Sequence, residues 1–200
     1  MNTLLFDIDG TLFDSRKFLR SVWDFFCMNF NIPILELRKT IDSYYFGLEN
    51  RTKFSPKDLV FDISKRFNAD NDSLWDIFWN NKKFYREALF PDTIGAITQI
   101  SKCYLIGTFS QGFLDFQKHK LEMIGVLDYF NPDLLFITAN KSDKNFLKTL
   151  PKNSIIIEDN YEVVEKLGNF KPVWINRNSD ENDPKIPTIH SLTELPQLIF

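Results

Sequence analysis

Short apolar runs and helically spaced apolar residues divide this chain into two kinds of segment. Residues 4–6 form one short apolar run, with the length and polar borders of a buried strand. Residues 15–89 read as helical instead, and Ser15 is a candidate N-cap. The apolar residues at the spacing of one helix face are Phe18, Val22, Phe25, Phe26 and Phe30. Further helices are expected over 34–46, 56–67 and 72–88.

From residue 90 onward, strand-like and helix-like segments alternate. Strands are expected over 103–109, 134–138, 154–157 and 172–175. Helices are expected between them, over 113–124, 143–150 and 162–167. This alternation predicts a parallel α/β sheet, in which ligands bind beyond the carboxyl ends of the strands. Residues 177–187, rich in Asn, Asp and Pro, read as a loop before a short C-terminal element.

One strand precedes the helical block, and the other strands follow it. A single strand cannot form a domain, so the first strand must belong with the later ones. We therefore expect an α/β fold with a Rossmann-like parallel-sheet core, formed by residues 1–14 and 90–200. An all-helical domain, residues 15–89, is inserted into it.

The composition and charge of the chain exclude some classes of function. Apolar residues make up 44% of the chain, which is enough for a sizeable core. The net charge is −3 and no basic cluster is present, so no nucleic-acid partner is expected. The apolar stretches are shorter than the roughly 20 residues that span a bilayer, and the amino terminus lacks a basic leader. Cys27 and Cys103 follow no pattern and are expected to be free thiols of a cytoplasmic protein.

The segment with the most candidate catalytic and metal-binding side chains directly follows the first strand: Asp7-Ile8-Asp9-Gly10-Thr11. Asp7 and Asp9 are two residues apart, and two like charges so close require a cation between them or a proton on one. The pair indicates a metal site, a nucleophile with an acid/base partner, or both. A calcium loop does not fit, because Gly falls at the fourth position of the run and not the sixth.

This pentad resembles the first motif of the haloacid dehalogenase (HAD)-like hydrolases, a superfamily dominated by magnesium-dependent phosphatases. The resemblance implies that Asp7 is a nucleophile that becomes an aspartyl-phosphate. Asp9 would protonate the leaving alcohol and then activate water. Carboxylates can serve as covalent nucleophiles, and phosphoryl transfer mostly requires alignment and charge neutralisation.

Three later segments resemble the remaining motifs of that superfamily. Ser110 ends an apolar strand and precedes Gln111-Gly112, a position suited to holding a phosphate oxygen, with Thr108 as the fallback. The resemblance implies that the phosphate group is bound by Thr11, Ser110 and Gln111. A lysine near the next helix would balance the phosphate charge; Lys141 is favoured and Lys144 is the alternative.

The fourth motif corresponds to Glu158-Asp159, after a β-branched strand. Mg²⁺ takes hard oxygen ligands, and the resemblance implies that Asp7, Asp159 and the backbone carbonyl of Asp9 bind it. Many members carry another Asp four or five residues later, where this chain has Val163 and Val164. Glu158 or Glu162 would compensate.

The resemblance predicts Mg²⁺-dependent hydrolysis of a small organic phosphate monoester by a monomer or homodimer. A phosphomutase with the same core residues and a non-catalytic binding or regulatory protein are the alternatives. Asp9 argues against the dehalogenase branch, which lacks an acid there and needs no metal. The inserted helices would set specificity, and the candidates for substrate contact are Arg16, Lys17, Tyr44, Tyr45, Arg51 and Lys53.

Overall fold

A computed structural model describes residues 2–49 and 54–199. The chain divides into two compact units, an α/β unit of Met1–Asp14 with Leu89–Phe200 and a helical unit of Ser15–Ala88. Leu89, expected in the insertion, is grouped with the α/β unit, where it forms a bridge with Phe13. Within the described residues, no helix is both long and apolar enough to cross a membrane.

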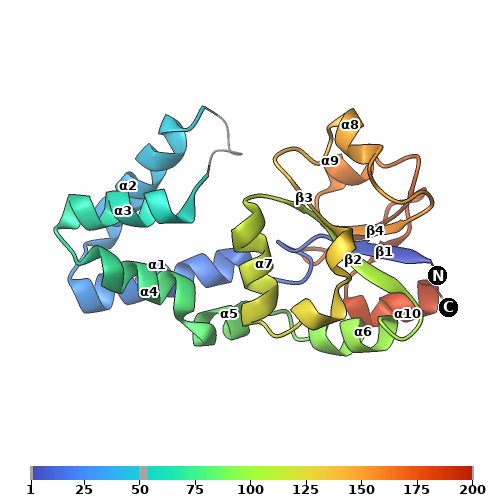
Figure 1. Cartoon of the computed structure of the whole chain (residues 1–200), viewed down its shortest axis with the longest axis horizontal. Coiled ribbons are helices and arrows are strands. Elements are labelled where there is room, and N and C mark those ends of the chain that lie inside the picture. The colour runs from blue at the N-terminus through green and yellow to red at the C-terminus, as the bar shows by residue number, and fades with distance from the viewer. Residues whose placement is uncertain (1, 50–53, 200) are drawn as a thin grey trace. The chain divides into compact units, whose positions relative to one another are not determined.

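The α/β unit is built on one six-stranded sheet with the order β3-β2-β1-β4-β5-β6 (Figure 1). Every neighbouring pair is parallel, which confirms the predicted fold class. The strands are β1 Thr3–Phe6, β2 Leu105–Gln111, β3 Leu135–Thr138, β4 Ile155–Glu158, β5 Lys171–Ile175 and β6 Thr188–Ile189. The strand order reverses between β1 and β4, and this is the switch point where open α/β sheets bind ligands.

Helices cover both faces of this sheet. They are α6 Thr93–Ile100, α7 Leu114–Met123, α8 Lys144–Leu147, α9 Tyr161–Val164 and α10 Leu195–Ile199. Short 3₁₀ turns span Leu127–Tyr129, Pro132–Leu134 and Leu192–Glu194. Figure 1 shows α8 and α9 on one side of the sheet and α6 and α10 on the other. The sequence did not predict α6 or the two-residue strand β6.

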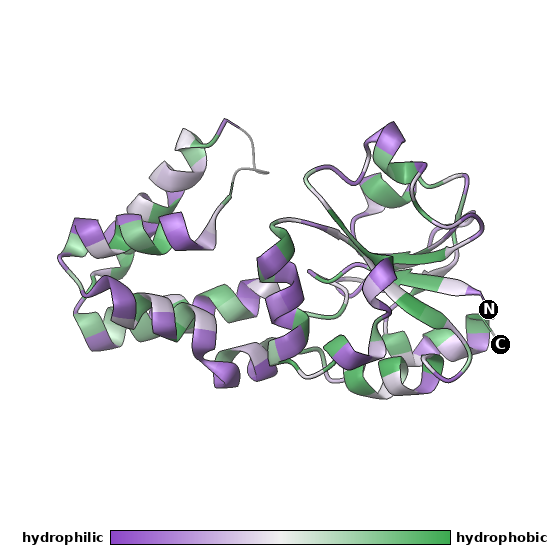
Figure 2. Cartoon of the chain, in the orientation of Figure 1, coloured by the Kyte–Doolittle hydropathy of each residue, from purple (hydrophilic) through white to green (hydrophobic). Residues whose placement is uncertain are grey.

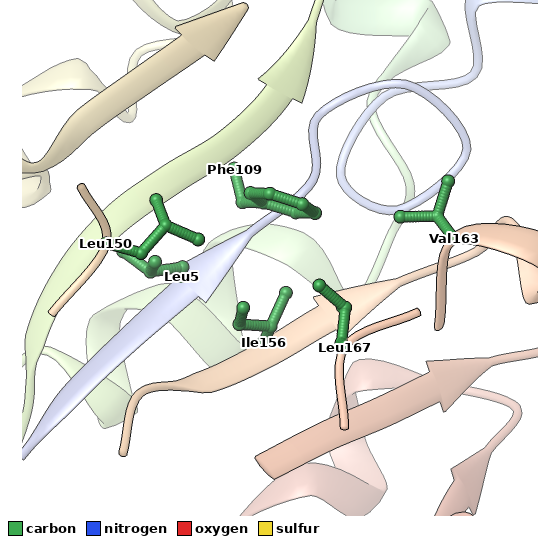
Figure 3. Packing of buried hydrophobic residues seen from close by; sticks show 6 residues of the cluster. All are labelled: Leu5, Phe109, Leu150, Ile156, Val163 and Leu167. Carbon is green, nitrogen blue, oxygen red and sulfur yellow. The ribbon is translucent and has the colours of Figure 1, made fainter. Parts of the chain in front are cut away.

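The apolar core lies against the sheet, and alternate residues of β1 serve its two faces. Leu5 belongs to a buried cluster on the side of α8 and α9 (Figure 3). The cluster consists of Leu5, Phe109, Leu150, Ile156, Val163 and Leu167. Phe6, the next residue of β1, instead meets Phe130 edge-on at 6.4 Å between ring centroids. Figure 2 shows the resulting hydrophobic colouring along the strands. Each such buried side chain stabilises the fold by about 1.5–3 kcal/mol.

Over residues 15–49 and 54–88, which the structure describes, the helical unit contains one helix more than the pattern predicts. Its helices are α1 Ser15–Phe30, α2 Ile34–Gly47, α3 Pro56–Phe67, α4 Asn71–Asn80 and α5 Lys82–Ala88. The expected continuous helix over 72–88 is wrong, because Asn81 leaves helical geometry with ψ at 83°. The break lets the Tyr85 hydroxyl, on α5, donate to the Phe78 carbonyl at 3.2 Å. The apolar spacing continues across the break, so periodicity alone does not reveal it.

Aromatic packing holds the helical unit together. Phe18 of α1 lies 5.5 Å from Phe78 of α4 and 4.4 Å from Tyr85 of α5, measured between ring centroids. Tyr44, a candidate for substrate contact, has its hydroxyl bonded to both backbone groups of Ser55. Tyr45 stacks on Phe54 at 5.5 Å. The candidates Arg51 and Lys53 lie outside the described residues.

A partly buried ion pair fixes the loop that follows β1. Arg177 donates from both terminal nitrogens to Asp92, at 3.0 Å each, and to the Thr11 carbonyl at 2.8 Å. Ser191 and the backbone N–H of Leu192 complete the shell of Asp92. Burial alone would raise the pKa of Asp92, but hydrogen bonds from Arg177 and Ser191 hold it below its usual value. The loop that carries Asp9 and Gly10 is thus anchored to the carboxyl-terminal part of the unit.

Arg177→Met should lower the free energy of unfolding by about 1–3 kcal/mol, because it leaves a mostly buried carboxylate without its cation. Urea denaturation measures this loss. Lys118→Met, at an exposed lysine of the same unit, is the control and should change stability by less than about 0.5 kcal/mol. An Arg177→Met midpoint equal to that of the control would contradict the anchoring role.

Candidate active site

The candidate site lies at the carboxyl ends of β1 and β4, at the switch point of the sheet. Asp7 directly follows β1, and its backbone N–H donates to the Ile157 carbonyl of β4 at 2.8 Å. Glu158 is the last residue of β4, and Asp159 follows it. Because β1 and β4 are parallel neighbours, their ends bring together carboxylates that are far apart in sequence.

Asp7 is buried and held on one oxygen by two side chains. The Ser110 hydroxyl, from β2, donates to Asp7 Oδ1 at 3.0 Å. Lys141 Nζ lies 2.7 Å from the same oxygen and 2.6 Å from Glu158 Oε2. Although burial alone would lower it, the charges of Asp7 and Glu158 hold the pKa of Lys141 above its usual value. Lys141 is therefore a buried cation shared between two carboxylates.

Three carboxylates form a group that fits a divalent cation. Ligand oxygens of Asp7, Glu158 and Asp159 all lie within 4.8 Å of one another. Burial and the nearby Asp7 charge raise the pKa of Asp159 to about 7 and also raise that of Glu158. The three carboxylates thus carry more negative charge than the nearby cations balance. Their oxygens are the hard ligands that Mg²⁺ prefers.

Gly10 is required by the position of Asp159. Gly10 has φ of +83°, and a Cβ atom built there would lie 2.2 Å from Asp159 Oδ2. Asp159 is fixed from the other side, since Trp174 Nε1 donates to its backbone carbonyl at 3.0 Å. Any side chain at position 10 would displace a carboxylate of the group.

Asp9 has a separate set of partners on α7. Lys120 Nζ lies 2.6 Å from Asp9 Oδ1, and Gln117 Nε2 donates to Oδ2 at 2.7 Å. Sequence reasoning did not single out Gln117 or Lys120, because polar residues on a short helix read as solvated. Their spacing of three residues, which places both on one face of α7, is the signal that was available.

The structure also places the other predicted residues. Of the two lysines, Lys141 joins the site and Lys144 is exposed on α8. The Thr11 and Thr108 hydroxyls are buried and have no hydrogen-bond partner among the described residues. Gln111 is exposed, and its backbone carbonyl accepts from Gln117.

The residues after β4 show which side chain takes the place of the later Asp that the fourth motif lacks in this chain. Val163 and Val164 are buried in the core, 8% and 1% exposed, so no carboxylate projects from these positions. Glu162 is exposed on α9, whereas Glu158 is only 1% exposed and belongs to the carboxylate group. Of the two glutamates that could compensate, Glu158 is therefore the one at the site. The roles of these residues stay predictions.

No protein-family model and no curated protein sequence matches this chain. Solved structures match it over nearly its full length. A HAD phosphatase from Thermococcus onnurineus is 22% identical with a TM-score of 0.63, and the match covers 100% of this chain and 98% of that one. A HAD hydrolase from Bacillus subtilis, solved bound to magnesium, is 19% identical with a TM-score of 0.65, covering 99% and 98%.

A 2-haloacid dehalogenase from Pseudomonas syringae matches equally broadly, at 13% identity, a TM-score of 0.62 and coverage of 100% and 98%. The chain has the haloacid dehalogenase-like fold. Both phosphatases and dehalogenases have the HAD-like fold, so the fold leaves the reaction open. The choice between them has to come from the site.

Without metal, the protein should lose stability as the pH rises. Asp159 and Glu158 have pKa values raised to about 7 and about 8 in the folded state, so the folded state holds protons that the unfolded state has released. This contribution to stability is then full below about pH 4 and is lost progressively between about pH 4 and 8. Melting temperatures in EDTA measure this loss.

Added Mg²⁺ should raise the melting temperature at pH 8 more than at pH 5, because protonated carboxylates bind it poorly. Asp159→Asn should flatten the pH slope, and Glu162→Gln, at the exposed glutamate, should leave it unchanged. A pH slope that Asp159→Asn does not alter would show that this group does not cause it.

Proposed function

We propose that this protein is a Mg²⁺-dependent phosphatase that hydrolyses a small organic phosphate monoester through an aspartyl-phosphate. The observation that carries the proposal is the environment of Asp7: a buried carboxylate at the switch point, held by a hydroxyl and an ammonium group, with Asp9 two residues on. Similarity in fold to a HAD phosphatase supports it.

In the first step, a carboxylate oxygen of Asp7 attacks phosphorus, and the bond from phosphorus to the ester oxygen breaks. Asp9, in its protonated form, gives its proton to the departing oxygen, which leaves as an alcohol. Ser110 and Lys141 contact Oδ1 of Asp7 and so orient the carboxylate. They are also placed to donate to the phosphoryl oxygens.

In the second step, the Asp9 carboxylate takes a proton from water as the water oxygen attacks phosphorus. The bond between phosphorus and the Asp7 oxygen breaks, which releases phosphate and restores both aspartates. Asp9 thus acts as an acid and then as a base, and this requires one carboxylate near both reacting oxygens.

The acidic group would supply the metal's protein ligands. Asp7, Asp159 and Glu158 would hold Mg²⁺, together with the Asp9 carbonyl oxygen. Bound Mg²⁺ neutralises charge on the transferring phosphoryl group.

The presence of Asp9 favours a phosphatase over a dehalogenase. Displacing a halide needs no proton for the leaving group, whereas an alkoxide needs one. The buried Lys120 and Gln117 both hold the Asp9 carboxylate, so the chain buries two polar side chains to keep this carboxylate in place beside Asp7. The intact Asp7 and Asp9 also weigh against a non-catalytic role.

Phosphate release from p-nitrophenyl phosphate and a panel of metabolite phosphates tests the proposal. We expect release with Mg²⁺, none with EDTA, and a loss of at least about a thousandfold in Asp7→Asn, since the amide is a poor nucleophile. Asp128→Asn, at an exposed aspartate of the same unit, is the matched control. Full activity in Asp7→Asn would exclude Asp7 as the nucleophile.

Lys141→Ala should lower kcat/KM by about 100- to 1,000-fold, because it removes the buried cation beside the nucleophile. Lys144→Ala, at the exposed lysine, should stay within about twofold of the wild type. Steady-state kinetics on both variants, with circular dichroism to check folding, make the comparison. Equal mild effects would remove both lysines from the site.

A further inference from the structure

The segment Gln117–Lys120 of α7 carries two buried polar side chains that the reaction described above does not use directly. Gln117 is 2% exposed and Lys120 is 4% exposed. Both side chains end on the carboxylate of Asp9, one on each oxygen. The side chain of Asp9 is itself 33% exposed, so the two buried groups hold a partly solvated one.

The Lys120 ammonium group is fixed by its surroundings. It lies 4.5 Å from the centroid of the Phe116 ring and 5.5 Å from that of Phe13. A buried ammonium group loses several kcal/mol of hydration, and pairing with a partly exposed carboxylate recovers this incompletely. The two aromatic rings and the Asp9 carboxylate together fix the position of the ammonium group.

Gln117 is fixed in the same manner. Its Nε2 donates to Asp9 Oδ2 at 2.7 Å and to the Gln111 carbonyl at 2.8 Å. Both partners are acceptors, so the amide cannot be turned over without placing Oε1 against two oxygens. Oε1 is buried and has no hydrogen-bond partner in the described part of the chain, which is an energetic cost of this orientation.

Gly112 makes room for the Gln117 amide. A Cβ atom at position 112 would lie 2.9 Å from Gln117 Nε2, and φ there is +145°. The segment Ser110-Gln111-Gly112 therefore does more than end β2. Ser110 contacts Asp7, Gln111 and Gly112 position Gln117, and Gln117 contacts Asp9.

We propose that Gln117 and Lys120 are positioning residues that hold both oxygens of the Asp9 carboxylate in the orientation needed for proton transfer. The inference rests on the proposed function, in which Asp9 serves two successive oxygens. A carboxylate that rotates would be in position to exchange a proton with either oxygen only part of the time. Holding the Asp9 carboxylate in one orientation removes this loss of rate.

The test is the kinetics of Lys120→Met and Gln117→Leu, which keep the size of each side chain and remove its donors. We expect kcat to fall about 10- to 100-fold, part of the contribution of a general acid/base, with KM changed less than about threefold. Lys120→Arg should recover part of the loss. Lys118→Met, on the same helix and exposed, should behave as the wild type.

Leaving-group dependence separates positioning from a purely structural role. An alkyl phosphate needs a proton on its leaving oxygen, and p-nitrophenyl phosphate does not. In single-turnover reactions, Lys120→Met should therefore slow aspartyl-phosphate formation more with the alkyl substrate. With p-nitrophenyl phosphate the aspartyl-phosphate should accumulate, because water activation is still impaired, and intact-protein mass spectrometry detects it.

Each outcome decides between the claims. An inactive wild type would overturn the proposed function and this inference with it. An active wild type, abolished by Asp7→Asn but with both substrates slowed equally in Lys120→Met and Gln117→Leu, would overturn the inference alone. If Lys120→Met does not fold, Gln117→Leu and Lys120→Arg carry the same comparison.

Discussion

The buried ammonium group of Lys141 is the interaction on which the candidate site depends. It lies 2.7 Å from Asp7 and 2.6 Å from Glu158, and both carboxylates are buried. An unpaired charge in this position would cost several kcal/mol, so each of the three groups is tolerable only because the others are present. With Asp159 included, the group still has more negative than positive charge, which is the condition that favours a divalent cation.

The stability of the sheet offsets the free-energy cost of holding these charged groups close together. β1, β2 and β4 are neighbours, and the strand ends deliver Asp7, Ser110 and Glu158 to one edge. The same strands carry the apolar cluster around Leu5 and Ile156 on one of their faces. Burial of apolar surface along these strands thus offsets the electrostatic repulsion among the carboxylates at the site. Such a cluster of charges lowers the stability of the fold but is well suited to binding a charged ligand.

The two aspartates of the first loop have different environments, although only one residue separates them. Asp7 is buried and paired with Lys141, whereas Asp9 is partly exposed and paired with Lys120. A separate cation for each, Lys141 in the turn before α8 and Lys120 on α7, lets the two carboxylates take two roles. Gly10, in the same loop, lets Asp159 approach Asp7, because a side chain at position 10 would collide with the Asp159 carboxylate.

The sequence by itself determined most of the elements and the order of the motifs, because apolar periodicity and residues at strand ends are local properties. It predicted the parallel sheet, the helical insertion and the segments that contain Asp7, Ser110 and Asp159. It did not predict the break at Asn81, since the apolar spacing continues across it. The sequence favoured Lys141 over Lys144 without deciding between them, and only the tertiary structure placed Lys141 beside Asp7 and Lys120 beside Asp9. A lysine on a short helix looks solvated in sequence, and whether it is buried depends on which strand end the fold brings against it.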